Sequence, residues 1–193
     1  MRRSLTSIVL IASAIGPSWA DGAVTIVPLV RVGDVLPGIG TVTLIESVSV
    51  NDRGDWSVEV DTDQTNTLTD AVVIINGIPA FREGQALLTP PGTTMGAFDS
   101  VFLSPTGLLG WDLGIGGGVP ANLNSGLFVG TSIVIRESDM STASGLSPNS
   151  PYVSFAESRL DGSDRLFFVG AVDDPAIPST SDRVIMRVDG ASN

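Results

Sequence analysis

The chain has 193 residues, 42% of them hydrophobic, a formal net charge of −11, and no Cys, His or Lys. The missing residue types exclude disulfides, thiolate and Schiff-base nucleophiles, Ser-His-Asp triads and zinc sites of the usual nitrogen and sulfur kind. The negative charge disfavours nucleic acid and anionic lipid as partners. Any catalysis would therefore depend on Asp, Glu, Arg, Tyr152 or a metal held by oxygen ligands.

Residues 1–20 have the order of a secretory signal peptide. Arg2 and Arg3 precede an apolar run, and the small residues Ser18 and Ala20 fit the positions before a peptidase cleavage site. The apolar run is about half as long as the roughly 20 residues that a membrane-spanning helix needs. The sequence therefore predicts a secreted or periplasmic protein that begins at Asp21 and is not inserted in a membrane after cleavage.

The remaining residues, 21–193, are predicted to form a single all-β domain. Gly, Pro, Ser, Thr, Asn and Asp are frequent there, and they separate short runs of Val, Ile, Leu and Phe. Such runs between turn-forming residues are typical of strands. The hydrophobic fraction is also too high for a disordered chain.

Three features recur at intervals of a little over fifty residues. An Arg followed two positions later by Gly or Ser occurs at Arg31, Arg82 and Arg136, which are 51 and 54 residues apart. Turn glycines lie between two strand-like runs, with spacings of 53 and 55 residues, at Gly54, Gly107 and Gly162. A hairpin with an Asn-Gly turn of type I′ is predicted at Asn76-Gly77.

These spacings divide the domain into repeats at roughly 31–84, 85–138 and 139–190. Each repeat has the length and the number of strands, about four, of a propeller blade. The sequence therefore predicts about three propeller-blade-like repeats of antiparallel strands, with a β-sandwich as the alternative. Trp56 and Trp111 begin equivalent strands in this alignment, which favours packing between sheets over exposure as sugar-stacking platforms.

The repeat also resembles a known family. Four segments of the first repeat are similar to the repeat of large, mostly uncharacterised exported bacterial proteins. They are Gly33-Asp34 with Pro37-Gly38 and Gly40, Asn51-Asp52 with Gly54, Asn76-Gly77, and Arg82-Glu83-Gly84. The resemblance is good over residues 31–84, partial over 85–139 and faint beyond. It implies a propeller-like architecture and an extracytoplasmic location, and it implies no chemistry.

The third repeat stops before its expected last strand, while Thr25–Asp34 resembles that strand and precedes the first repeat. Propellers use such a permutation to close a ring, which predicts pairing of Val27–Val32 with Val184–Val188. Closed propellers have about 4–8 blades, so three would be unusual. The alternatives are an open or sandwich-like arrangement, or a homo-oligomer in which strands are completed between chains.

A polar loop offers the ligands of a hard cation. Side-chain oxygens alternate along this loop, at Asp61, Asp63 and Thr65, and Asp70 lies nearby. Oxygens at this spacing can surround Ca²⁺. The EF-hand pattern is absent, because Asn66 and Val72 stand where that loop needs Gly and Glu. The alternative is a solvated hairpin loop in an acidic protein.

Other carboxylates are candidates for a glycosidase acid and base: Asp173-Asp174, and the set Asp52, Asp55 and Asp61. That chemistry needs two carboxylates within about 5–10 Å of each other across a cleft. The alternative is that each Asp forms a turn. The main functional hypothesis is therefore an exported structural or interaction module without a catalytic site, binding a protein or polysaccharide partner. The second is a carboxylate-based, Ca²⁺-dependent enzyme acting on polysaccharide.

Overall fold

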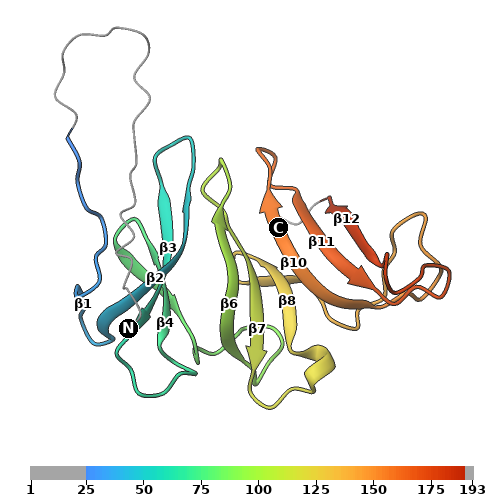
Figure 1. Ribbon diagram of the computed structural model, residues 1–193, viewed down its shortest axis with the longest axis horizontal. Helices are drawn as coiled ribbons and strands as arrows, with labels where there is room; N and C mark the ends of the chain where they lie inside the picture. The colour runs from blue at the N-terminus through green and yellow to red at the C-terminus, as the bar shows by residue number, and fades with distance from the viewer. Residues whose placement is uncertain (1–24, 190–193) are drawn as a thin grey trace, which may run out of the picture.

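The computed structural model describes residues 25–189, so the predicted signal peptide and the start at Asp21 lie outside the described part. In this range the chain forms three antiparallel sheets that follow one another in sequence (Figure 1). A single turn of 3-10 helix, η1 (Ala121–Leu123), precedes β8. The prediction of an all-β fold of antiparallel strands is confirmed.

Each sheet is a meander in which every strand pairs with the next one along the chain. The first sheet contains β1 (Val35–Leu36), β2 (Gly40–Val50), β3 (Trp56–Thr62), β4 (Ala71–Ile75) and β5 (Ile78–Arg82). The second sheet contains β6 (Thr94–Leu103), β7 (Leu109–Gly116), β8 (Ser125–Val129) and β9 (Ser132–Arg136). The third sheet contains β10 (Tyr152–Leu160), β11 (Leu166–Val172) and β12 (Arg183–Val188).

The long hairpin of each sheet closes with the same turn. The first turn residue uses a side-chain oxygen to accept hydrogen bonds from the backbone N–H groups two and four positions later. That residue is Asn51 in the first sheet, Ser104 in the second and Asp161 in the third. A short polar side chain at this position satisfies two N–H groups that the turn leaves without a strand partner.

The turn also needs a positive φ at its fourth residue, which is Gly54, Gly107 and Asp164 in the three sheets, with φ of 81°, 89° and 55°. The alignment of Gly162 with the two glycines was therefore wrong by two residues. Asp tolerates the left-handed region better than most residues, so glycine is not required there. At Asn76-Gly77 both central residues have positive φ, 49° and 83°, as a type I′ hairpin requires.

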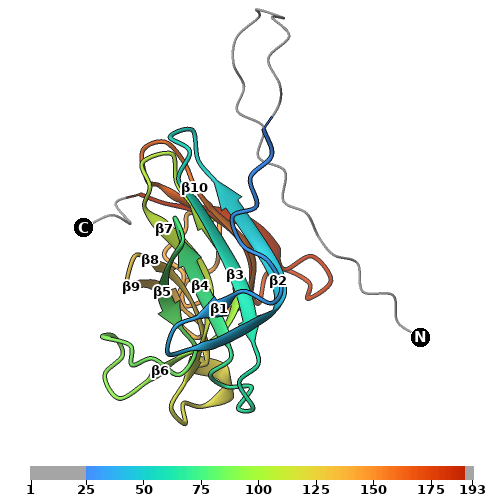
Figure 2. The same ribbon diagram turned by 90° about the vertical axis from the view of Figure 1, so that its left-hand side faces the viewer.

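The three sheets lie face against face in a row. Figure 1 shows the first sheet at one end, the third at the other and the second between them, and Figure 2 looks along the row from the first sheet. One buried cluster fills the space between the first and second sheets, and a second fills the space between the second and third. A third covers the outer face of the first sheet, where Val30, Leu36 and Ile39 pack on Val42, Val58 and Val60.

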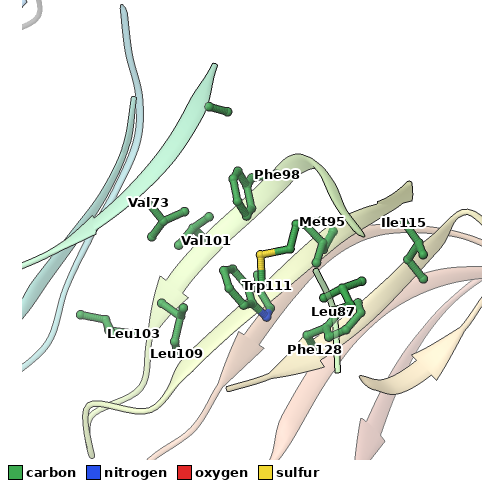
Figure 3. Close-up of a cluster of buried hydrophobic side chains, with 12 residues drawn as sticks. Val73, Leu87, Met95, Phe98, Val101, Leu103, Leu109, Trp111, Ile115 and Phe128 are labelled. Atoms are coloured by element: carbon green, nitrogen blue, oxygen red, sulfur yellow. The ribbon is translucent and has the colours of Figure 1, made fainter. Parts of the chain in front are cut away.

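Trp111 is the centre of the cluster between the first and second sheets (Figure 3). Its ring stacks on Phe98 at 5.6 Å and meets the edge of Phe81 at 4.4 Å. Trp56 is half-buried against the outer face of the first sheet. The strand registers pair Trp111 with Val101 and Val58 with Val48, so Val58 is the counterpart of Trp111 in the first sheet. Trp56 lies two residues earlier. The two tryptophans therefore pack on sheets at positions that are not equivalent.

The structure corrects the predicted ring closure within one chain. Arg31 to Asp34 form a turn, and Gly33 N and Asp34 O bond to Val42 of β2. Within residues 25–189, β12 pairs with β11 alone. Residues 27–32 lie beside the first sheet and β12 lies at the far end of the row, because two sheets separate them (Figure 1).

Candidate functional site

The loop predicted to bind Ca²⁺ connects β3 to β4. Asp63 accepts a hydrogen bond from Thr41 N at 2.8 Å, which holds the start of β2 and lowers the pKa of this carboxyl. The carbonyl of Asp70 accepts bonds from the N–H and the hydroxyl of Thr62. The oxygens of this loop therefore tie strands together.

Across residues 25–189, no group of three or more Asp, Glu, His or Cys residues is placed to hold a metal ion. Asp61 lies at the end of β3, Asp63 and Thr65 are exposed in the loop, and Asp70 directly precedes β4. Ligation of Ca²⁺ by Asp61, Asp63, Thr65 and Asp70 stays a prediction.

Two of the carboxylates considered for glycosidase chemistry, Asp55 and Asp174, hold turns. Asp55 accepts hydrogen bonds from the side-chain amides of Asn51 and Asn76, both at 3.1 Å, and so joins two hairpin ends. Asp174 is buried and accepts bonds from Ser147 N at 2.6 Å and Ala176 N at 2.8 Å. These bonds lower the pKa of Asp174, which keeps it ionised, as an anchor for a loop requires.

Two buried carboxylates, Glu59 and Asp112, were not among the sequence candidates. Glu59 lies in the middle of β3 and Asp112 in the middle of β7, at the same register position of their sheets, and they are 4% and 2% exposed. Ser47 donates to Glu59 at 3.0 Å, and Ser125 donates to Asp112 at 3.4 Å. Burial raises the pKa of each to about 7, and neighbouring carboxylates add to both shifts.

A β-bulge faces each of these carboxylates. In the first sheet, Glu46 and Ser47 are extra residues of β2 opposite Glu59. In the second sheet, Asp99 is an extra residue of β6 and lies next to Ser100, which pairs with Asp112. A bulge turns an additional side chain toward the neighbouring sheet. In the third sheet the same positions hold Ala156 and Val169, so that sheet lacks the acidic pair.

The acidic pairs, Glu46 with Glu59 and Asp99 with Asp112, recur 53 residues apart, and this spacing is visible in the sequence. It was hidden because an acidic residue between two apolar ones in a strand, as in Val58-Glu59-Val60, is typical of a sheet with one face in water. Here a neighbouring sheet covers that second face. A carboxyl with a pKa near 7 can exchange a proton at neutral pH, but these two lie between sheets and make their hydrogen bonds to serine.

The tips of the three long hairpins form a continuous polar edge at one end of the molecule (Figure 1). Asn51 and Arg53 donate to the carbonyls of Ser104 and Thr106 at 3.1 and 2.6 Å. The hydroxyl of Thr106 in turn donates to Asp164 at 2.5 Å. Each tip therefore fixes the next.

Comparisons with models of protein families, with curated proteins and with solved structures found no match to this chain. Within residues 25–189, no helix has the length and apolar character needed to cross a membrane.

Proposed function

We propose that this chain is an exported structural or interaction module, secreted or periplasmic, whose stacked sheets present a polar edge to a protein or polysaccharide partner. The observation that carries the proposal is how the carboxylates are used. Asp55, Asp63 and Asp174 hold backbone or amide N–H groups in turns, and Glu59 and Asp112 lie between sheets. Hydrogen bonds within the protein engage all five of these carboxyls, which favours a structural use over that of a glycosidase acid and base.

Two further observations support this proposal. The residues of the first repeat resemble exported bacterial repeat proteins, and residues 1–20 have the pattern of a signal peptide. The hairpin tips are held in place by side chain to backbone bonds from one sheet to the next, so their outward groups have fixed positions. Fixed polar groups on a rigid scaffold suit recognition, because little conformational entropy is lost on binding.

Export is tested by the intact mass of the protein recovered outside the cytoplasm. We expect a chain that begins at Asp21, because Ser18 and Ala20 fit the cleavage site. Recovery of a form that keeps Arg2 and Arg3 would contradict the cleavage, and absence of the protein from the extracytoplasmic fractions would contradict the location.

The absence of catalysis is tested with xylan, alginate and carboxymethyl cellulose, with and without millimolar Ca²⁺. We expect no release of reducing ends above that of Asp55→Asn and Asp174→Asn proteins. These two substitutions should instead lower the midpoint of thermal unfolding, since each weakens bonds that hold a loop. Hydrolysis that both substitutions abolish, in variants that remain folded, would overturn the proposal in favour of a carboxylate-based enzyme.

A further inference from the structure

The third sheet has one edge and one face without a neighbour in the described chain. β12 pairs with β11 on one side, and its other edge carries no strand. Ile185, in the middle of β12, is 79% exposed. Its counterparts in the other two sheets, Val73 of β4 and Leu127 of β8, are 0% exposed, because in both cases the next sheet covers that face.

A stretch with the sequence of a last strand lies outside the sheets at the other end of the described molecule. Val27–Arg31 has the sequence Val-Pro-Leu-Val-Arg, which aligns with Ile-Pro-Ala-Phe-Arg of β5. The side chains of Ile26, Val27 and Leu29 are exposed, and within the described residues this stretch joins no sheet.

The turn after this stretch shows that it occupies the place of a last strand. Arg31 N bonds to Asp34 Oδ2 at 2.8 Å, as Arg82 N bonds to Gln85 and Arg136 N to Asp139 Oδ2. The chain then pairs with the first long strand of the next sheet in the same way, through Gly33, Gly84 and Ser138.

Its packing supports the same assignment. The residue before each arginine enters the core of the following sheet: Phe81 packs with the second sheet, Ile135 with the third, and Val30 with the first. Within residues 25–189, Val27–Arg31 therefore has the place of a last strand but no sheet of its own, and the third sheet has no last strand.

We propose that Val27–Arg31 of one copy adds to the free edge of β12 in a second copy, completing the third sheet as β9 completes the second. The pairs of β9 with β8 set the register, which places Arg31 opposite Val184 and Val30 opposite Ile185. Addition of a strand to an open edge is a common mode of association, because the backbone groups of both strands gain partners.

One polar contact is specific to this register. Arg82 Nε donates to Thr69 O and Arg136 Nε donates to Leu123 O, both at 2.7 Å, and each acceptor lies two residues before the third long strand of its sheet. The corresponding residue of the third sheet is Ser181. In the assembly Arg31 of one copy donates to Ser181 O of the other, whereas among residues 25–189 of one chain its guanidinium makes an exposed ion pair with Asp34 at 3.5 Å.

The two complementary surfaces lie at opposite ends of the row, so the contact is head to tail (Figure 1). A head-to-tail contact closes into a ring or continues as a filament. Two copies carry six sheets, which falls within the about 4–8 blades of closed propellers. The assembly is therefore a closed dimer. It goes beyond the proposed function, which would stand if the chain were monomeric.

The first test is the molar mass of the full chain in solution, by light scattering after gel filtration. We expect twice the chain mass for the unchanged protein. Ile185→Asp should raise the dissociation constant by about tenfold or more, because it buries an unpaired charge in the contact. Val153→Asp is the matched control: it also adds a charge at an exposed apolar position, but on β10, and should leave the dimer intact. A monomeric unchanged protein, or equal effects of both variants, overturns the proposal.

The second test uses the absence of native cysteine. Val27 aligns opposite Arg187, and both side chains are exposed in the single chain, so a Val27→Cys and Arg187→Cys double variant should fold. Oxidation or a short bis-maleimide should give covalent dimers in which peptide mapping finds residue 27 linked to residue 187. A Val27→Cys and Val153→Cys variant should give no such dimer above background. A link from 27 to 187 within one chain would overturn the proposal.

Discussion

The second and third sheets follow the same plan and have different surroundings. The second sheet has four strands and is covered on both faces, by the first sheet through Trp111 and Phe128 and by the third through Phe102 and Leu127. Within residues 25–189, the third sheet has three strands and is covered on one face only. An apolar residue at a given position of the repeat can thus be core in one sheet and surface in the next. The neighbours of a sheet decide burial as much as its own sequence does.

The sharpest test of this difference compares Leu127→Ala with Ile185→Ala, at equivalent positions of β8 and β12. Leu127→Ala should lower the free energy of unfolding by about 2–5 kcal/mol, because it leaves a cavity between two sheets. Ile185→Ala should change it by less than about 0.5 kcal/mol in the monomer. Urea denaturation in dilute solution measures both. A large loss for Ile185→Ala there would show that its face is covered within one chain.

A second test uses the acidic pairs, which the second sheet has and the third lacks. Burial raises the pKa of Glu59 from 4.5 to about 7 and that of Asp112 from 3.8 to about 7. Between the ordinary and the raised pKa the folded chain binds more protons than the unfolded chain. The stabilisation is therefore complete at low pH and is lost as the pH rises through 7.

We expect the free energy of unfolding to fall by about 1–3 kcal/mol per group between pH 5 and pH 8. Asp63 and Asp174, whose pKa values are lowered, make the free energy of unfolding rise with pH, and they do so only at more acidic pH. Glu59→Gln and Asp112→Asn proteins should show a flatter dependence. Val169→Ala, at the equivalent position of the third sheet, is the control and should keep the full slope. Equal slopes in all four proteins would contradict the assignment.

The smallest expected effect concerns turns in the first and third sheets. Gly77 has φ of +83°, so Gly77→Val should lower the free energy of unfolding by about 1–2 kcal/mol. Gly162 lies outside the positive-φ region and has no atom within 4 Å of an added Cβ. Gly162→Val should therefore change stability by less than about 0.5 kcal/mol. Equal denaturation midpoints for the two variants would show that Gly77 is not in a type I′ turn.

The sequence predicted the local features that depend on a few neighbouring residues. Asn76-Gly77 was recognisable because few dipeptides allow two positive φ values in succession. Gly54 and Gly107 were aligned correctly because glycine adopts a positive φ readily, and their turn needs one at that position. Gly162 was misaligned because the turn depends on the acceptor at Asp161 and accepts Asp164 at the strained position.

Features that depend on the arrangement of sheets were not predicted. Glu59 and Asp112 had the pattern of outward-facing residues, and only the neighbouring sheet makes them buried. The same holds for ring closure, because the distance from Val30 to β12 is set by how successive sheets stack. Asp63 was recognised as part of a polar loop, whereas its role in holding Thr41 depends on the long-range pairing of β2 with β3.

The last strand of a sheet also supplies the core of the next one, since Phe81 of β5 contacts Trp111 and Ile135 of β9 lies in the same buried cluster as Phe168. Each sheet thereby shares side chains with its successor, and nearest-neighbour terms of this kind make unfolding cooperative along a repeat array. A break between β5 and β6 would leave Phe81 on one fragment and its contacts on the other. The unit that folds is consequently the sheet together with the strand that precedes it, and the boundaries of that unit fall inside the sheets instead of between them.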